Sequence, residues 1–201
     1  MLRAAVIKAV ALASAVAVVV GLAACGGDGG SEDGDGRVAE DRSASSPPVA
    51  LPEGEELYEP PGGLREGPVG SLVWYEERPS VGEARAWRIL ARSSNGEGER
   101  TWATARVFRP VGPAPEGGFP VVVWVHGTAG LADRCAPSRS AGAVPGIGSL
   151  LAAGFVVVAP DGAGLGTPGP TAYLVGVDEG HAVLDAVRSA TQVPGADAGT
   201  E

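Results

Sequence analysis

A short apolar run that enters a glycine-containing loop is the part of this sequence with the clearest chemical use. Residues 121–126 (VVVWVH) have the pattern of a strand buried on both faces, and residues 127–130 (GTAG) follow directly. Backbone N–H groups in a loop after such a strand stabilise the oxyanion that forms during ester hydrolysis. We therefore expect Thr128, with Gly127, to form half of an oxyanion site. His126 would shape the loop.

The nucleophile that would complete this site is not found among the 201 residues. No serine has glycine at both of its second neighbours, so the motif Gly-x-Ser-x-Gly does not occur. The two histidines, His126 and His181, both precede the position where that serine would fall. Because the order in α/β hydrolases is Ser, then acid, then His, neither is expected to be the catalytic base. We expect no catalytic residue in this chain and a solvated or partly packed helical position for His181.

The first 24 residues predict an export signal. Arg3 and Lys8 precede an apolar stretch at residues 9–24, which is short and rich in alanine for a membrane span. The tetrapeptide Leu-Ala-Ala-Cys that ends at Cys25 resembles a bacterial lipobox, in which the cysteine is acylated after cleavage. We expect residues 1–24 to be a signal peptide and Cys25 to anchor the protein to the outer face of the cytoplasmic membrane. The alternative is an ordinary cleaved signal with an unmodified cysteine.

The segment after the signal predicts a flexible acidic tether over residues 25–50, because it has no aromatic residue and many acidic and glycine residues. The chain has a net charge of -9, and its arginines are scattered. Nucleic acid is therefore not an expected partner. Two distant histidines and one further cysteine, Cys135, make no set of metal ligands, and nothing indicates an organic cofactor. Cys135 either pairs with a cysteine outside these residues or stays a small buried thiol.

Residues 51–201 predict a single α/β domain. Residues 51–70 are rich in Pro, Gly and Glu and indicate an irregular lead-in. Residues 87–93 and 100–109 carry β-favouring side chains and flank the polar turn 94–99, which predicts a hairpin.

Two continuous apolar runs then predict strands of a parallel sheet. Residues 121–126 and 155–160 are joined through a helical pattern at residues 148–153, which makes a βαβ unit. A longer helix is expected over residues 173–193. We expect residues 155–160 to form the strand that is left at the open edge of the sheet.

Four motifs in a fixed order resemble those of a known family. They are His-Gly-Thr, Asp-Arg-Cys-Ala-Pro-Ser, Asp-x-x-Gly-Leu-Gly-Thr-Pro-Gly and Tyr-Leu-x-Gly-x-x-Glu-Gly, all within residues 84–190. Together they resemble the secreted lipase family of the α/β-hydrolase superfamily. The resemblance implies the N-terminal half of an α/β-hydrolase fold, with a mostly parallel doubly wound sheet, that stops before the nucleophile elbow. It also implies a disulfide from Cys135 to a downstream cysteine.

The same resemblance implies a lipase or esterase that hydrolyses an ester or lipid substrate with a Ser-Asp/Glu-His triad outside this chain. The alternatives are an exported lipoprotein that binds an apolar or acyl ligand without catalysis, and an inactive fragment. Residues 164–169 also match Gly-x-Gly-x-x-Gly, but Pro168 and Pro170 disfavour the helix that a dinucleotide site needs. Asp161 is expected to brace the turn after its strand and so to support the oxyanion loop.

Overall fold

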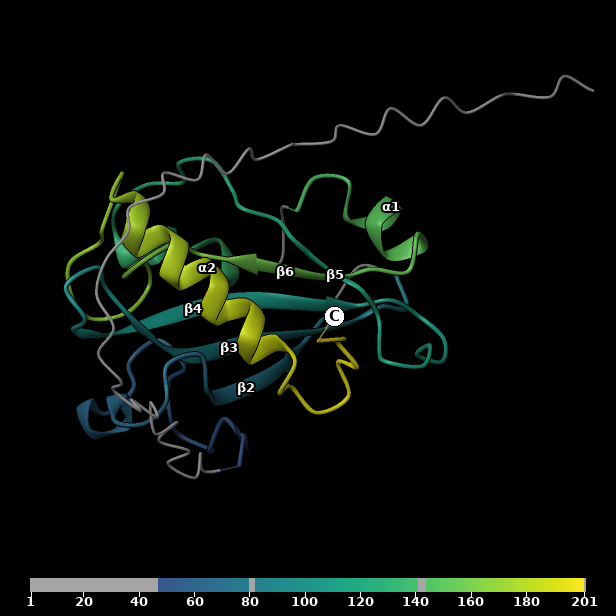
Figure 1. Ribbon diagram of the computed structural model, residues 1–201, viewed down its shortest axis with the longest axis horizontal. Coiled ribbons are helices and arrows are strands. Elements are labelled where there is room, and N and C mark those ends of the chain that lie inside the picture. The colour runs from purple at the N-terminus through teal and green to yellow at the C-terminus, as the bar shows by residue number, and fades with distance from the viewer. Residues whose placement is uncertain (1–46, 80–81, 141–143, 201) are drawn as a thin grey trace, which may run out of the picture. The chain divides into compact units, whose positions relative to one another are not determined.

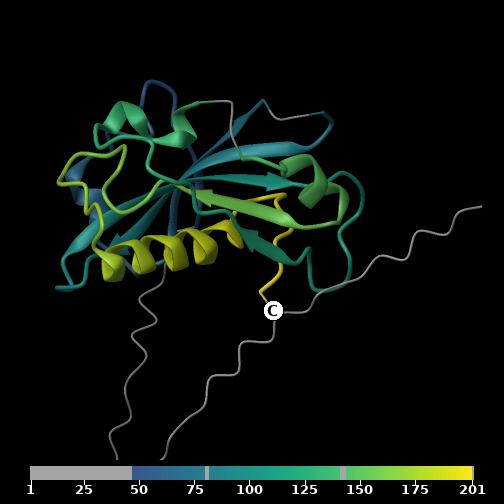
Figure 2. The same ribbon diagram turned by 90° about the horizontal axis from the view of Figure 1, so that it is seen from above.

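The computed structural model describes residues 47–79, 82–140 and 144–200. These residues form a six-stranded mixed sheet in the order β1-β2-β3-β4-β6-β5, with helices against both faces (Figures 1 and 2). The strands are β1 (Val49–Ala50), β2 (Leu72–Arg78), β3 (Arg85–Ser94), β4 (Arg100–Arg109), β5 (Val121–Val123) and β6 (Val156–Pro160). The α-helices are α1 (Ile147–Ala152) and α2 (Gly176–Ala190), and the 3₁₀ helices are η1 (Gly62–Arg65), η2 (Asp133–Cys135) and η3 (Pro137–Arg139). None of the helices in these ranges is long and apolar enough to cross a membrane.

The predicted hairpin is confirmed as β3 and β4, which pair antiparallel along their whole length. The side chain of Asn95 organises the turn, because its Oδ1 accepts the backbone N–H of Glu97 at 3.1 Å and of Glu99 at 2.8 Å. Asparagine favours such turns since its short side chain replaces a backbone acceptor.

The predicted βαβ unit is also confirmed, with β5 and β6 parallel and α1 between them. Gly154 has a φ of +84° directly after α1, a backbone conformation that glycine adopts without strain. The first strand is shorter than predicted. Its pairing ends with the bond from Trp124 N–H to Val158 O at 2.8 Å, and the chain then leaves the sheet toward the loop that holds His126.

The prediction of a mostly parallel sheet is wrong for the described residues. β1 with β2 and β5 with β6 are parallel, whereas β2 with β3, β3 with β4 and β4 with β6 are antiparallel. The expected position of residues 155–160 is wrong as well. β6 lies between β4 and β5, so the strand at the open edge is β5. β2 was not predicted at all, because LVWYEER has four apolar or aromatic residues followed by three charged ones, without alternation, and comes after an irregular lead-in.

The longer helix begins and ends inside its predicted range. Leu174 has a φ of +64°, which is incompatible with a right-handed helix, so α2 begins only at Gly176. After the helix, Ala198 forms a parallel bridge with Phe119, just before β5. Phe119 N–H donates to Asp197 O and Gly199 N–H to Phe119 O, both at 2.8 Å. Residues 197–199 therefore lie alongside the chain that enters β5.

The core has a layer on each face of the sheet. α2 lies across one face, where three alanines let the helix come close to the strands. The main cluster on that face consists of Leu72, Trp87, Ile89, Ala105, Val107, Phe119, Val156, Val158, Ala186, Ala190, Val193 and Ala196. The opposite face is covered by the lead-in segment, which contributes Leu57 and Tyr58, and by α1.

Replacing Ile89, which is 0% exposed, by Ala should destabilise the fold strongly. The cavity left between α2 and the sheet is expected to lower the free energy of unfolding by about 2 to 5 kcal/mol. Val177→Ala on α2, at a position that is 59% exposed, should change it by no more than about 0.5 kcal/mol. Urea unfolding of both variants tests this, and equal effects would contradict the assigned core.

Candidate functional site

His126 holds the start of the loop that follows β5. Its Nε2 lies 2.8 Å from the backbone oxygen of Asp161, at the end of β6, and its Nδ1 contacts the backbone oxygen of Gly127. Backbone carbonyls only accept hydrogen bonds, and a neutral imidazole donates through one nitrogen only. Both contacts are therefore hydrogen bonds at the same time only when the ring carries two protons. The ring ties the loop to the end of β6 when Nε2 carries a proton, because Nε2 is the atom that contacts Asp161 O.

Asp161 is the most highly connected buried side chain near this loop. It is 1% exposed, and its Oδ1 accepts the backbone N–H of Ser138 at 2.7 Å. Its Oδ2 accepts the hydroxyl of Thr104 at 2.7 Å and the hydroxyl of Ser138. Burial raises the pKa of Asp161, and the hydrogen bonds from Ser138 and Thr104 oppose that rise. The carboxylate thus joins the end of β6 to β4 and to η3.

The lead-in segment contributes to the same network through Tyr58. The phenol oxygen of Tyr58 lies 2.7 Å from Ser138 Oγ. Because the Ser138 hydroxyl donates to Asp161, it accepts from Tyr58 and passes one directed chain of hydrogen bonds to the carboxylate. Burial raises the pKa of Tyr58, which keeps the phenol protonated as that chain requires.

Backbone N–H groups in the loop are available to a ligand. Within the described ranges, the N–H groups of Gly127, Thr128 and Ala129 form no hydrogen bond, and all three residues are exposed. They border a pocket of about 190 Å³. Its apolar walls come from Leu131, Leu165, Leu174 and Val183. The two predicted oxyanion residues, Gly127 and Thr128, thus lie together at a pocket, with His126 and Asp161 beside them.

Two further polar side chains of this pocket were not predicted as site residues from the sequence. Tyr173 OH lies 3.0 Å from Thr128 Oγ1 and so fixes the threonine hydroxyl. Glu179, in the first turn of α2, accepts the backbone N–H of Ala163 at 3.1 Å. Both belong to the motif Tyr-Leu-x-Gly-x-x-Glu-Gly, which was the one signal that could have identified them. The motif brings the start of α2 against the loop of Thr128 and the turn after β6.

The remaining predicted residues occupy other positions. Cys135 is half-buried, forms no disulfide with the described residues, and packs so closely on Gly130 that a Cβ there would lie 2.7 Å from Cys135 Sγ. His181, on α2, is half-buried with its Nδ1 3.0 Å from Ser94 O. Cys25 lies outside the described residues.

The glycine-rich segment 164–169 forms turns, and the next helix begins only at Gly176. The helix N-terminus that would hold a pyrophosphate is therefore not formed at this segment. In the described part of the chain, no three His, Cys, Asp or Glu side chains are arranged to hold a metal ion.

Asp161→Asn should change how stability depends on pH. Since burial raises the pKa of Asp161 above 3.8, the folded state binds this proton more tightly than the unfolded state does. As the pH rises from 3.8 through the folded pKa, the native protein should therefore lose stability relative to Asp161→Asn. The measurement is urea unfolding of both proteins from about pH 4 to about pH 8. A stability difference that stays constant over this range would show that the pKa is not raised.

No protein-family model matches the sequence, and no curated protein sequence matches it. Solved structures are similar to it. Lipase A of Candida antarctica in its closed state has a TM-score of 0.57 and 23% sequence identity, over 72% of this chain and 36% of that chain. The rice cell wall degrading esterase LipA from Xanthomonas oryzae has a TM-score of 0.52 and 25% identity, over 61% of this chain and 37% of that chain.

A ligand-bound form of the same esterase has a TM-score of 0.51 and 22% identity, over 62% of this chain and 38% of that chain. This chain therefore covers little more than a third of the length of each of these structures. With its six-stranded mixed sheet, the chain is structurally similar to part of the α/β-hydrolase fold of these lipases and esterases.

Proposed function

We propose that this chain supplies the oxyanion-loop part of a carboxylic ester hydrolase, a lipase or esterase, whose Ser-Asp/Glu-His triad lies outside these 201 residues. The observation that carries this proposal is the loop itself. Its backbone N–H groups at Gly127, Thr128 and Ala129 form no hydrogen bond with the described residues and border an apolar pocket. The similarity to a lipase and an esterase supports the same reaction class.

The chemistry follows from the charge that develops during ester hydrolysis. Attack on the ester carbonyl forms a tetrahedral oxyanion, and the backbone N–H of Thr128 would donate to it, with Gly127 beside it. Removing one such donor typically reduces the rate by about two to three powers of ten. Removing a serine nucleophile and its base costs about six powers of ten. We therefore infer that this chain alone hydrolyses esters no faster than background.

The pocket walls favour an ester with an apolar acyl or alkyl part. Leu131, Leu165, Leu174 and Val183 line the pocket beside the loop, and Tyr173 and Glu179 are among its polar residues. Apolar walls with few polar groups are typical of sites for small apolar ligands. The same walls also suit the second candidate, a lipoprotein that binds an apolar or acyl ligand without catalysis. The two candidates differ in whether the backbone N–H groups contribute to binding.

For the location, we propose export and attachment to the outer face of the cytoplasmic membrane through a lipidated Cys25. The support is the sequence alone: the signal-like residues 1–24 and the Leu-Ala-Ala-Cys tetrapeptide. The acidic segment that precedes β1, predicted as residues 25–50, would then tether the domain to the membrane.

Thr128→Pro tests the oxyanion donor. Hexylphosphonate, a tetrahedral anion with an apolar chain, serves as the probe, and hexanol is its uncharged counterpart. Proline removes the N–H, so binding of the phosphonate should weaken by about tenfold, while Thr128→Ala keeps the N–H and should change it by less than about twofold. Isothermal titration measures both. If the phosphonate and hexanol bind equally well and both are insensitive to Thr128→Pro, the chain is the non-catalytic binder.

Cys25→Ser tests the anchor. In a bacterial host, the native sequence should incorporate radioactive palmitate and sediment with the membrane fraction. The variant should lose the label and move to the soluble fraction, because it lacks the thiol that is acylated and the acyl chains that hold the protein on the membrane. Label and fractionation that do not change in the variant would contradict the lipid anchor.

A further inference from the structure

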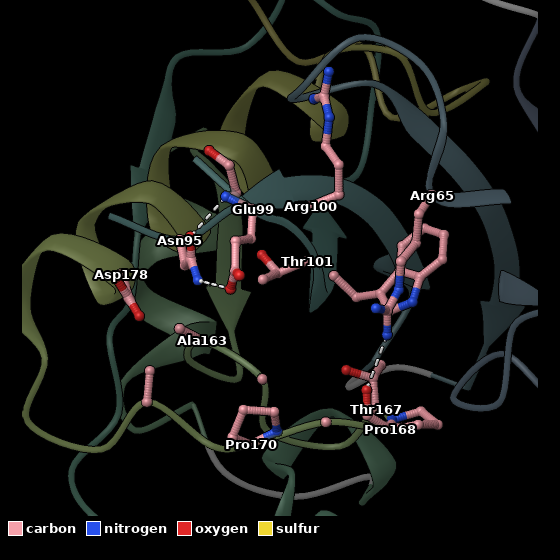
Figure 3. A pocket seen from close by; sticks show the side chains of 15 residues that line it. Arg65, Asn95, Glu99, Arg100, Thr101, Ala163, Thr167, Pro168, Pro170 and Asp178 are labelled. Atoms are coloured by element: carbon pink, nitrogen blue, oxygen red, sulfur yellow. Dashed lines mark hydrogen bonds between the residues drawn. The ribbon is translucent and has the colours of Figure 1, made fainter. Parts of the chain in front are cut away.

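A second cavity, of about 330 Å³, lies next to the candidate site but shares no lining residue with it. It is enclosed by the tip of the β3–β4 hairpin, the turn segment 163–172, η1 and the start of α2 (Figure 3). Its volume is near the lower end of the range of about 300 to 1,000 Å³ that is usual for small-molecule sites. No step of the proposed ester hydrolysis uses it.

A positively charged group with unused donors lines one side of this cavity. The guanidinium of Arg65 lies over the ring of Trp102, at 5.7 Å from the centroid, and its Nη2 donates to Pro168 O at 3.1 Å. A guanidinium has five N–H donors, and this is the one bond that Arg65 makes to the described residues. Its Nε is a buried nitrogen without a partner. Arg65 is thus held in place while most of its guanidinium N–H groups have no partner among the described residues.

Two carboxylates line the opposite side, where Figure 3 shows Glu99 and Asp178 across the cavity from Arg65. Each uses one oxygen to hold the hairpin tip. Glu99 Oε2 accepts from Asn95 Nδ2 at 2.8 Å, and Asp178 Oδ1 accepts the backbone N–H of Gly96 at 2.7 Å. The second oxygen of each carboxylate makes no hydrogen bond to the described residues. Arg100 also borders the cavity, but its side chain extends away from these two carboxylates (Figure 3).

Part of the wall between the two charged sides is small and apolar. Ala163, Gly164 and Pro170 form this part, and the hydroxyl-bearing Thr101 and Thr167 also line the cavity. Gly164 has a φ of +71°, and a Cβ there would lie 2.2 Å from Pro170 O, so no side chain fits at this position. Proline lacks an N–H, so this wall has few groups that would need a polar partner. An apolar ligand body can therefore span the distance between the cation and the carboxylates.

We propose that this cavity binds a small zwitterion of about dipeptide size, with its carboxylate at Arg65 and its ammonium group at Glu99 and Asp178. Opposite charges at the two ends of the cavity match the two ends of such a ligand, and this complementarity gives specificity. A guanidinium forms strong hydrogen bonds with a carboxylate, which would use the donors that Arg65 has left over. Ligands with a single charge would leave one end of the cavity unmatched.

The test uses the full chain and three forms of one dipeptide, Ala-Leu. The zwitterion should bind at least about tenfold more tightly than the N-acetylated form, which lacks the cation, and the C-amidated form, which lacks the anion. Isothermal titration gives the three dissociation constants. No binding of the zwitterion, or equal binding of the three forms, would overturn the proposal.

Two variants test which side chain binds each charged end of the dipeptide. Arg65→Gln should abolish the preference over the C-amidated form and keep the preference over the N-acetylated form. Glu99→Gln, at an exposed position, should reduce the preference over the N-acetylated form and keep the preference over the C-amidated form. Arg100→Gln is the matched control and should change neither preference. Circular dichroism and a thermal melt confirm that each variant folds. If Arg100→Gln reduces the preference for the zwitterion as much as Arg65→Gln does, the net charge of the protein, and not the contact with Arg65, decides binding.

Discussion

The carboxylate of Asp161 is the group on which the arrangement of the candidate site depends. Three hydrogen bonds, two from Ser138 and one from Thr104, converge on a side chain that is 1% exposed. Removing one partner of such a buried network leaves the others unsatisfied, which costs more than a single surface bond. The backbone oxygen of the same residue lies 2.8 Å from His126 Nε2. The buried network and the loop that begins at His126 therefore share Asp161.

This residue also shows what the sequence could and could not predict about the site. An aspartate directly after a buried strand predicts a braced turn, because such side chains bind nearby backbone groups. Its actual partners lie farther away in the sequence, on β4 and η3, with Tyr58 from the lead-in behind them. No local pattern connects these positions. The sequence therefore predicted the residue and the loop it supports, and the fold was needed to find the network.

The pairing of the strands was likewise predicted only in part. The hairpin of β3 and β4 and the unit β5-α1-β6 were predicted, because turn residues and apolar runs specify contacts between neighbouring segments. The antiparallel pairing of β4 with β6 joins segments separated by β5 and α1, and local periodicity carries no information about it. That pairing joins the parallel pair of β5 and β6 to the other four strands and places β6 in the interior of the sheet. The position matters for the site, because it leaves β5, the strand that leads into the loop of Thr128, at the open edge.

Several different parts of the chain hold the segment between β6 and α2. Asp161 fixes its start, Glu179 binds the backbone N–H of Ala163, and Arg65 binds the backbone oxygen of Pro168. One side of this segment faces the loop of Thr128, and the other faces the cavity at Arg65. Glycines at positions with positive φ, among them Gly162, Gly164 and Gly166, let the segment turn tightly enough to wall both spaces. Because these contacts hold the wall in one position, a ligand in the Arg65 cavity does not need to displace the loop of Thr128.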